Sequence, residues 1–279
     1  MNEVLIKEKL KQFYLEDVGH QDVATMSIFT KKEPAKAYFY AKETGVIAGI
    51  SIIKHMYHMI DPSIRVTLKK QDGQSIKKQE TIAEVTGPIP SILVGERVIL
   101  NLIQRMSGIA TTTNHAVQKL NDPTIKICDT RKTTPGLRIF EKYAVSCGGG
   151  WNHRNGLYDG AMIKDNHIVA AGSIKNAVQK VREQVGPMIK IEVETETKEQ
   201  VMEAVDAKCD IIMFDNRTPY EIQQLLPLVP KHIYTEASGG ITLNTINEFR
   251  HVGVDFISLG FLTHSVKALD ISVMIEGGY

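Results

Sequence analysis

Apolar and polar residues alternate along the second half of the chain in a regular pattern. Short apolar runs recur from residue 121 onward, and each ends in a polar residue before a stretch of helical periodicity. Three successive runs end at Glu194, Asp215 and Glu236, two steps of 21 residues each, and one strand, one helix and two short loops need about 20 residues. Such a succession predicts a parallel sheet and favours an α/β barrel. The expected strands span 125–129, 161–164, 189–194, 211–215, 232–236 and 256–260.

The first hundred residues follow a different, mixed pattern. A rough helical stripe precedes a strand-like alternation at 36–41. Expected strands at 66–69 and 81–85 flank the Asp-Gly pair at 72–73, which is a strong turn signal. A long helical pattern then continues from about 91 to 120. This part of the chain is therefore expected to be a mixed α and β domain.

A cluster of cations follows the first expected barrel strand. The segment 129–138 carries three permanent cations, including Arg131 and Lys132. Arg154 follows the triple glycine at 148–150, and Lys164 ends the expected strand at 161–164. Arginine binds carboxylate and phosphate oxygens in two-pronged fashion, and lysine adds a compact point charge. The carboxyl ends of barrel strands meet in one mouth. The pattern thus predicts a pocket for a small anion that carries several charges.

Two glycine loops follow consecutive late strands. Ser238, Gly239 and Gly240 precede an expected helix at 241–246, and Gly260 follows the next strand. Glycines let backbone amides approach an anion, and a helix N-terminus adds a favourable dipole. Either loop alone is as well explained by an ordinary tight turn. Their position after consecutive late strands favours a phosphate site.

Two carboxylates, Glu194 and Asp215, end strands that lie one βα unit apart. In a phosphate-binding mouth such a pair holds Mg²⁺, often through water, or hydrogen-bonds sugar hydroxyls. Neutralisation of the nearby lysines and arginines is the alternative. Glu192 and Glu194 are expected to point to opposite faces of their strand, so that one of them is structural. Glu194 is favoured for the site because it lies nearer the strand end.

Lys164, Cys147 and several histidines allow other readings. A Schiff-base lysine of an aldolase-like barrel is one interpretation of Lys164, although the arginines nearby favour an anion contact. His153 stands out from His167 and His264 because it adjoins Arg154 and a triple glycine. Cys147 lacks a His/Asn arrangement, so an inert thiol is expected.

The composition excludes some classes of function. The hydrophobic share of 43% and the charged share of 23% are ordinary for a globular protein. A net charge of +1 argues against a nucleic-acid-binding module, and no apolar run reaches the roughly 18 residues that cross a bilayer. The N-terminal stretch is not expected to be a signal peptide, and three widely spaced cysteines indicate reduced thiols. A cytoplasmic protein without nucleic-acid or membrane partners is expected.

An ordered series of short motifs along nearly the whole chain resembles the quinolinate phosphoribosyltransferase family. One departure is His20-Gln21, where the family commonly has a glycine in a tight loop, which affects only the local loop shape. The motifs are Leu15-Glu16-Asp17-Val18-Gly19, Glu96-Arg97, Ser107-Gly108-Ile109-Ala110-Thr111, the segment 129–136, Gly149-Gly150-Trp151-Asn152-His153-Arg154, Lys164-Asp165-Asn166-His167, Glu192-Val193-Glu194, Asp215-Asn216, Ser238-Gly239-Gly240 and Thr263-His264-Ser265.

The resemblance implies a particular architecture. It implies an N-terminal α/β sandwich domain over 1–104, joined by 267–279, and an incomplete, seven-stranded type of TIM-like α/β barrel over 105–266. It also implies a homodimer in which each barrel mouth is completed by the neighbour's N-terminal domain. In some members the dimers assemble further into a hexamer, a trimer of dimers.

The resemblance also implies a reaction, in which quinolinate and phosphoribosyl pyrophosphate (PRPP) give nicotinate mononucleotide, pyrophosphate and CO₂ with Mg²⁺ as cofactor. Its catalytic residues would be Lys132, Glu194 and Asp215. Quinolinate would contact Arg97 (from the partner subunit), Arg131, Lys132, His153 and Arg154. PRPP would contact Lys164, His167, Glu194, Asp215, Ser238, Gly239, Gly260 and His264, with Mg²⁺ at Glu194 and Asp215. A paralogue associated with molybdenum uptake is an alternative within the same fold.

Overall fold

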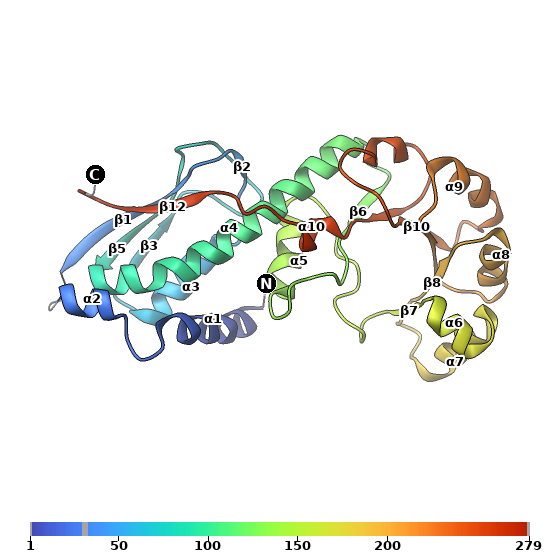
Figure 1. The fold of residues 1–279 in the computed structure, drawn as a ribbon, viewed down its shortest axis with the longest axis horizontal. Helices are drawn as coiled ribbons and strands as arrows, with labels where there is room; N and C mark the ends of the chain where they lie inside the picture. Colours follow the sequence, from blue (N-terminus) through green and yellow to red (C-terminus); the bar gives the residue numbers. More distant parts are fainter. Residues whose placement is uncertain (1, 30–32, 278–279) are drawn as a thin grey trace. The chain divides into compact units, whose positions relative to one another are not determined.

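In a computed structural model of the chain, two compact units can be described from residues 2–29 and 33–277 (Figure 1). The remaining residues, which include parts of the predicted ranges 1–104 and 267–279, lie outside the described residues. The first unit comprises Met1–Thr112, Ile139–Gly149 and Ser265–Tyr279, and the second comprises Thr113–Arg138 and Gly150–His264. No helix in the described ranges has the length and hydrophobicity needed to span a membrane.

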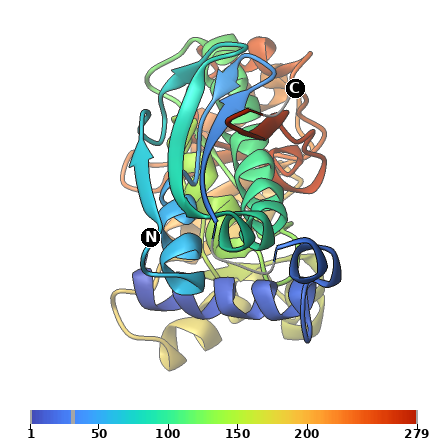
Figure 2. The same cartoon turned by 90° about the vertical axis from the view of Figure 1, so that its left-hand side faces the viewer.

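The first unit is an α/β sandwich built on a four-stranded antiparallel sheet in the order β12-β1-β5-β3. Residues of β1 alternate in exposure, because one face of the strand is buried. Figure 2 shows α4 behind these strands. The elements are α1 (Glu3–Val18), α2 (Val23–Ile28), β1 (Pro34–Ala41), β2 (Gly45–Val46), α3 (Ser51–Ile60), β3 (Arg65–Leu68), β4 (Ser75–Ile76), β5 (Thr81–Pro88), α4 (Ile89–Leu120), α5 (Arg138–Cys147) and β12 (Ile271–Ile275).

Helix α4 passes without interruption through Ser107 and Gly108, where the sequence has small residues. The Ser107 hydroxyl donates to Ala48 O and accepts from Ala48 N, so it binds backbone of a neighbouring segment. A β-carbon on Gly108 would lie 2.2 Å from the Lys267 carbonyl oxygen. The small residues thus admit the approach of other backbone segments within this unit.

Residues 139–149 lie in the first unit, although the sequence boundary assigned them to the barrel range. Phe140 is 1% exposed and packs against Phe13 of α1, with ring centroids 6.1 Å apart. Glu141 is buried and pairs with Arg105 of α4 at 2.6 Å. The Tyr143 hydroxyl donates to Asp72 at 2.7 Å. These contacts, and not chain order, determine where α5 belongs.

The second unit is the incomplete TIM-like α/β barrel, a parallel sheet in the order β6-β11-β10-β9-β8-β7. In Figure 1 helices α6, α8 and α9 lie outside the strands. The strands are β6 (Lys126–Cys128), β7 (Ala161–Ile163), β8 (Ile191–Thr195), β9 (Ile211–Asp215), β10 (Tyr234–Ser238) and β11 (Phe256–Ser258). The helices are α6 (Asp165–Ala171), α7 (Ile174–Gln184), α8 (Lys198–Asp206), α9 (Pro219–Leu225) and α10 (Phe261–His264), with short 3-10 turns η1 (Leu226–Leu228) and η2 (Ile246–Phe249).

Two details of the barrel differ from expectation. The described residues form six named strands in this sheet, and a single bridge from Cys128 to Trp151 stands where a seventh would be. The expected helix at 241–246 was wrong, since a turn and η2 occupy the region. Side chains of Thr242 and Thr245 hydrogen-bond to local backbone there, which offers the chain an alternative to helical bonds.

Helix α4 provides a test of close backbone packing. Alanine at position 108 would favour the helix by about 1 kcal/mol on propensity alone. Because its methyl group would clash with the Lys267 carbonyl, we expect Gly108→Ala to lower the free energy of unfolding by about 1–3 kcal/mol. Urea denaturation followed by circular dichroism measures the change. His115→Ala, at an exposed position of the same helix, is the control and should cost little; an unchanged or higher stability of Gly108→Ala would contradict the packing.

Candidate active site

The inward face of the barrel strands is unusually polar. Residues at alternate positions of a strand share a face, and the register aligns Glu194 with Met213 and Met213 with Glu236. The outward positions, such as Val193 and Phe214, are apolar and fully buried. TIM-type barrels ordinarily fill their interior with branched apolar side chains. The interior of this barrel is therefore built for charged groups.

A cavity of about 550 Å³ lies at the carboxyl ends of these strands. Strand order places the ends of β8, β9 and β10 side by side, so their last inward residues face one space. The lining residues are Thr130, Arg131, Lys132, His153, Arg154, Met162, Lys164, Glu194, Met213, Asp215, Asn216, Glu236, Ser238, Gly239, Gly240 and Ser258.

One wall of the cavity carries the cations, and a buried carboxylate shapes it. Asp129 is fully buried and accepts hydrogen bonds from the His153 amide at 2.9 Å and from Asn152 Nδ2 at 2.6 Å. It thereby ties the loop after β6 to the loop that carries His153 and Arg154. Thr263 donates to the Lys132 carbonyl at 2.8 Å and holds the first loop from the other side.

The two arginines of this wall influence each other. Burial and, second, the charge of Arg131 lower the pKa of Arg154 below its ordinary value. Arg154 donates to the Gly160 carbonyl at 3.0 Å, whereas the buried Nε of Arg131 has no hydrogen-bond partner among the described residues. Such a pair of crowded guanidinium groups is suited to a ligand with two anionic groups. Arg138 is different, because it bonds to Thr133 and to the Asn155 carbonyl and supports the loop.

The opposite wall carries the carboxylates. Glu194 Oε2 accepts from Lys164 Nζ at 2.5 Å, and Asp215 Oδ2 accepts from Asn216 at 2.7 Å. The ion pair involves two residues that were predicted for the same substrate. The His167 ring accepts from the Lys164 amide at 3.0 Å and caps α6; His167 does not line the cavity.

The first glycine loop is held by a close contact between backbone and side chain. A β-carbon on Gly239 would lie 2.4 Å from Asn216 Oδ1, and the residue has a φ of +85°. Asn216 itself has a φ of +52°, and its amide donates to the Ser238 carbonyl at 2.9 Å. Because the expected helix is absent here, no helix dipole adds to this loop. Backbone amides would have to provide the anion contacts.

The second glycine loop lies near Lys132. A β-carbon on Gly260 would lie 3.1 Å from Lys132 Cδ and 3.1 Å from His264 Cδ2. Gly260 and His264 are not among the residues that line the cavity. Arg97 is exposed on α4 of the first unit, so its predicted role in the site stays a prediction.

Two glutamates missed as site residues by the sequence reasoning lie inside the barrel. Glu236 is 2% exposed and lines the cavity described above. Glu192 is 3% exposed and lines a second cavity of about 200 Å³. His153, Arg154 and Glu236 also line this second cavity. The expectation that Glu192 and Glu194 point to opposite faces was wrong. Residues two apart in a strand share a face, and both glutamates line cavities inside the barrel. The strand parity of Glu192, Glu194 and Glu236 could have found them.

Chemistry based on a nucleophilic side chain is not favoured by this geometry. Burial raises the pKa of the Cys147 thiol to about 12, which keeps it protonated. Lys164 is held as an ammonium partner of Glu194, whereas Schiff-base formation requires a neutral amine. The arrangement can bind anions and stabilise positive charge between carboxylates.

Comparisons with known proteins agree with this arrangement. Residues 22–107 match the N-terminal domain and residues 109–274 the C-terminal domain described as quinolinate phosphoribosyl transferase. A probable nicotinate-nucleotide pyrophosphorylase (carboxylating) of Bacillus subtilis (strain 168) is 55% identical over 98% of this chain and 94% of its own. A chloroplastic nicotinate-nucleotide pyrophosphorylase (carboxylating) of Arabidopsis thaliana is 42% identical over 97% of this chain and 83% of its own.

A solved structure extends the likeness to the fold. The crystal structure of NadC from Streptococcus pyogenes superposes with a TM-score of 0.95 at 40% identity, covering 98% of this chain and 97% of that one. Both halves of the sequence and the whole fold thus agree. This chain belongs to the quinolinate phosphoribosyltransferase family.

Proposed function

We infer that this chain is a quinolinate phosphoribosyltransferase of NAD biosynthesis. It transfers phosphoribose from PRPP to quinolinate with decarboxylation, and it releases nicotinate mononucleotide, pyrophosphate and CO₂. The observation that carries this conclusion is the cavity itself, in which crowded guanidinium groups face carboxylates and a glycine loop. A pyridine dianion and a phosphorylated sugar are complementary to those two walls.

The cationic wall would bind the two carboxylates of quinolinate. Arg131, with a buried Nε that has no partner among the described residues, and Arg154 are the primary contacts. Lys132 is close enough to the Gly260 loop to contact both substrates. His153 belongs to the same wall.

The carboxylate wall would support transfer to the ribose. Breaking the bond between C1 and pyrophosphate leaves positive charge on the sugar, which Glu194 and Asp215 would stabilise electrostatically. The pyridine nitrogen supplies its own lone pair, so no protein nucleophile is required. Lys164 and His167 would face the pyrophosphate, while Ser238, Gly239, Gly260 and His264 would bind the 5-phosphate.

Mg²⁺ is part of the proposal, and the donor set fits it. Carboxylate oxygens are hard ligands of the kind Mg²⁺ prefers, and it usually keeps several waters. Glu194 and Asp215 line the same cavity from adjacent strands. When bound, the ion would add positive charge for the pyrophosphate leaving group.

Decarboxylation requires little of the protein beyond orientation. Once ribosylated, the ring nitrogen is cationic and stabilises the electron pair left on the adjacent carbon when the C–C bond breaks and CO₂ departs. A proton from water then binds that carbon and gives nicotinate mononucleotide. Arg131 and Arg154 must bind the departing carboxylate without stabilising it more than the transition state, since only differential binding raises the rate.

A role associated with molybdenum uptake is the alternative within this fold. The two roles differ in substrate, so competition between quinolinate and nicotinate for the purified protein separates them. The crowding of Arg131 and Arg154 favours a substrate with two carboxylates over one.

A homodimer with a shared active site, which in some cases forms a hexamer, completes the proposal. Exposed apolar residues on α1 and α2 of the first unit, including Val4, Leu15 and Met26, support an interface. Arg97 is exposed on the same unit and would reach the quinolinate site of the partner subunit. Contacts with nucleic acid or membranes are not proposed.

The proposed location is the cytoplasm. Cys128, Cys147 and Cys209 are thiols and do not form disulfides among the described residues, and thiols persist in reducing compartments. Burial raises the pKa of Cys209 to about 12, so this thiol is as inert as Cys147.

The activity has a direct test. Purified protein with quinolinate, PRPP and Mg²⁺ should form nicotinate mononucleotide in a spectrophotometric assay. Arg131→Ala should lower kcat/KM roughly 10- to 150-fold, because a charged hydrogen bond contributes about 1.5–3 kcal/mol. Arg182→Ala, at an exposed position of α7, is the control and should retain activity. Absence of product from the wild-type protein would exclude the function.

Removal of the metal tests the carboxylate wall. With EDTA in excess, turnover should stop and should return when Mg²⁺ is restored. Asp215→Asn should raise the Mg²⁺ concentration needed for half-maximal rate by about tenfold or more, because it removes a charged ligand. An unchanged Mg²⁺ requirement in this variant would remove Asp215 from the metal site.

The shared site is tested by mixing two inactive variants. Arg97→Ala and Arg131→Ala proteins, mixed under conditions that exchange subunits, should regain activity if Arg97 acts in the partner's site. A hybrid dimer then contains one site with both arginines intact. Mass spectrometry verifies the exchange, and no recovery after verified exchange would assign both arginines to the same subunit's site.

A further inference from the structure

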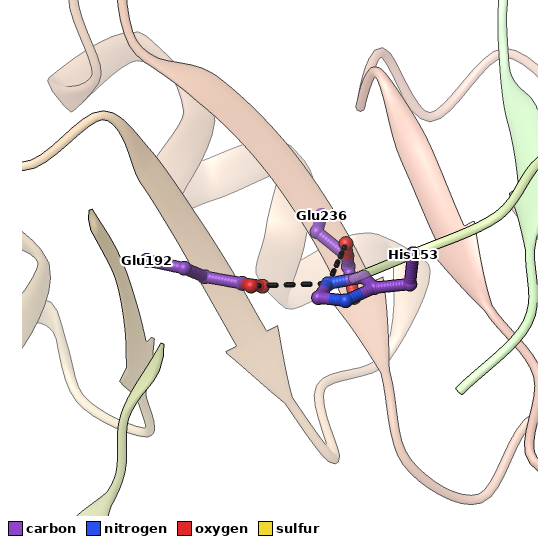
Figure 3. Close-up of side chains that lie close together, drawn as sticks. All are labelled: His153, Glu192 and Glu236. Atoms are coloured by element: carbon purple, nitrogen blue, oxygen red, sulfur yellow. Dashed lines mark ion pairs between the residues drawn. The ribbon is translucent and has the colours of Figure 1, made fainter. Parts of the chain in front are cut away.

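Two buried glutamates and the half-buried His153, from different segments, meet inside the barrel, and Figure 3 shows them converging. His153 Nε2 lies 3.0 Å from Glu192 Oε2 of β8 and 3.4 Å from Glu236 Oε2 of β10. The glutamates are 3% and 2% exposed. Two carboxylates around one imidazole nitrogen are costly to bury unless they serve that nitrogen.

The position of the ring proton follows from the second nitrogen. His153 Nδ1 accepts a hydrogen bond from the Arg154 amide at 2.8 Å. A nitrogen that accepts carries no proton, so in this geometry the ring proton is on Nε2, between the two carboxylates. Both ring nitrogens are therefore engaged with protein groups, and neither presents an N–H to a substrate.

The electrostatics favour a proton at Nε2. Burial alone would lower the pKa of His153, but the hydrogen bonds and charges of Glu192 and Glu236 outweigh it and raise the pKa. Both carboxylates face Nε2, so they favour a proton on that nitrogen. A proton on Nδ1 would point at the Arg154 N–H and remove the acceptor of that hydrogen bond. The backbone contact therefore favours a ring that is protonated on Nε2 only.

These three residues also have the composition of a metal site, with ligand atoms within 4.8 Å of one another. A neutral histidine binds a metal through a nitrogen that carries no proton. The Arg154 contact leaves the proton on Nε2, the very atom that faces both carboxylates. The geometry thus favours a proton over a metal ion at this position.

We propose that Glu192 and Glu236 are positioning residues that, through the ring of His153, hold Arg154 in place for the pyridine dicarboxylate. The glutamates fix the Nε2–H, and the opposite side of the ring fixes the Arg154 amide. The guanidinium of Arg154 is held separately by the Gly160 carbonyl at 3.0 Å. This inference rests on the proposed function only for the identity of the ligand.

The charge of Glu192 also acts on a guanidinium group near the ring. The positive groups nearby are the side chains of Arg154 and Arg131, which repel each other, and Asp129 binds the His153 amide. The charge of Glu192 also acts on Arg154 and favours its cationic form. Glu192 therefore offsets part of the repulsion between the guanidinium groups, while both glutamates orient the ring.

The proton position is measurable without any substrate. Protein labelled with ¹⁵N in its histidine rings, studied by two-bond ¹H–¹⁵N correlation, should show His153 protonated on Nε2 and bare on Nδ1 between pH 6 and 9. His153→Gln assigns the signal. A bare Nε2 at neutral pH, or a stoichiometric metal ion that is lost in Glu192→Gln, would overturn the proposal.

Kinetics separate positioning from a merely structural role. Glu192→Leu and Glu236→Leu remove the acceptors and should raise KM for quinolinate about 10- to 100-fold, the loss typical of a displaced contact, while KM for PRPP changes less than twofold. Glu192→Gln and Glu236→Gln keep an acceptor oxygen and should restore most of the affinity. Glu248→Gln, exposed on η2, is the control.

The outcomes remain distinct from those of the functional test. Equal increases in both KM values, or no change in folded Leu variants, would refute the positioning role. If the Leu variants do not fold, the Gln variants and the wild-type ring signal still decide it. If the protein lacks the proposed activity but His153 keeps its Nε2–H, the assignment of the ligand as quinolinate is wrong, whereas the positioning of Arg154 by the His153 ring stands.

Discussion

The structure depends on the burial of opposite charges inside a parallel barrel. A charged group moved out of water costs several kcal/mol unless partners surround it. Here Asp129, Glu192 and Glu236 are almost fully buried. Asp129 accepts hydrogen bonds from the His153 amide and Asn152, and the two glutamates flank Nε2 of the His153 ring. The outward residues of the same strands are apolar, so the helices around the barrel pack as they do in any parallel α/β protein. The interior therefore does not have to supply the apolar core, and its charged side chains line the cavity.

This arrangement suits a reaction in which charge moves. Two guanidinium groups that repel each other have more to gain from a dianion than from a neutral ligand, and the carboxylates opposite them favour a cationic sugar. The walls are held by different means. Hydrogen bonds accepted by Asp129 and donated by Thr263 fix the cationic loops, whereas close contact with Asn216 shapes the glycine loop.

Much of the fold could be predicted from periodicity, because each barrel strand is an apolar run followed by a polar residue. The expected strand at 232–236 is displaced to Tyr234–Ser238, since Pro230 and the turn after it delay the strand. The residues of α5 could not be assigned to the first unit, because its contacts with Phe13 and Arg105 are distant in sequence. In the site, cations and strand-end acids were recognisable by type and position. The pairing of His153 with Glu192 and Glu236 was not, as it joins three segments.

The antiparallel pairing of β12 with β1 bears on how the protein is made. During synthesis β1 leaves the ribosome early, whereas Ile271–Ile275 is translated after the whole barrel. Until then one edge of the sheet has no strand beside it, and an unpaired edge is a template for association with other chains. The nascent protein must therefore carry an open sheet edge while some two hundred further residues are added, which makes this edge the natural point of contact for a chaperone or for aggregation.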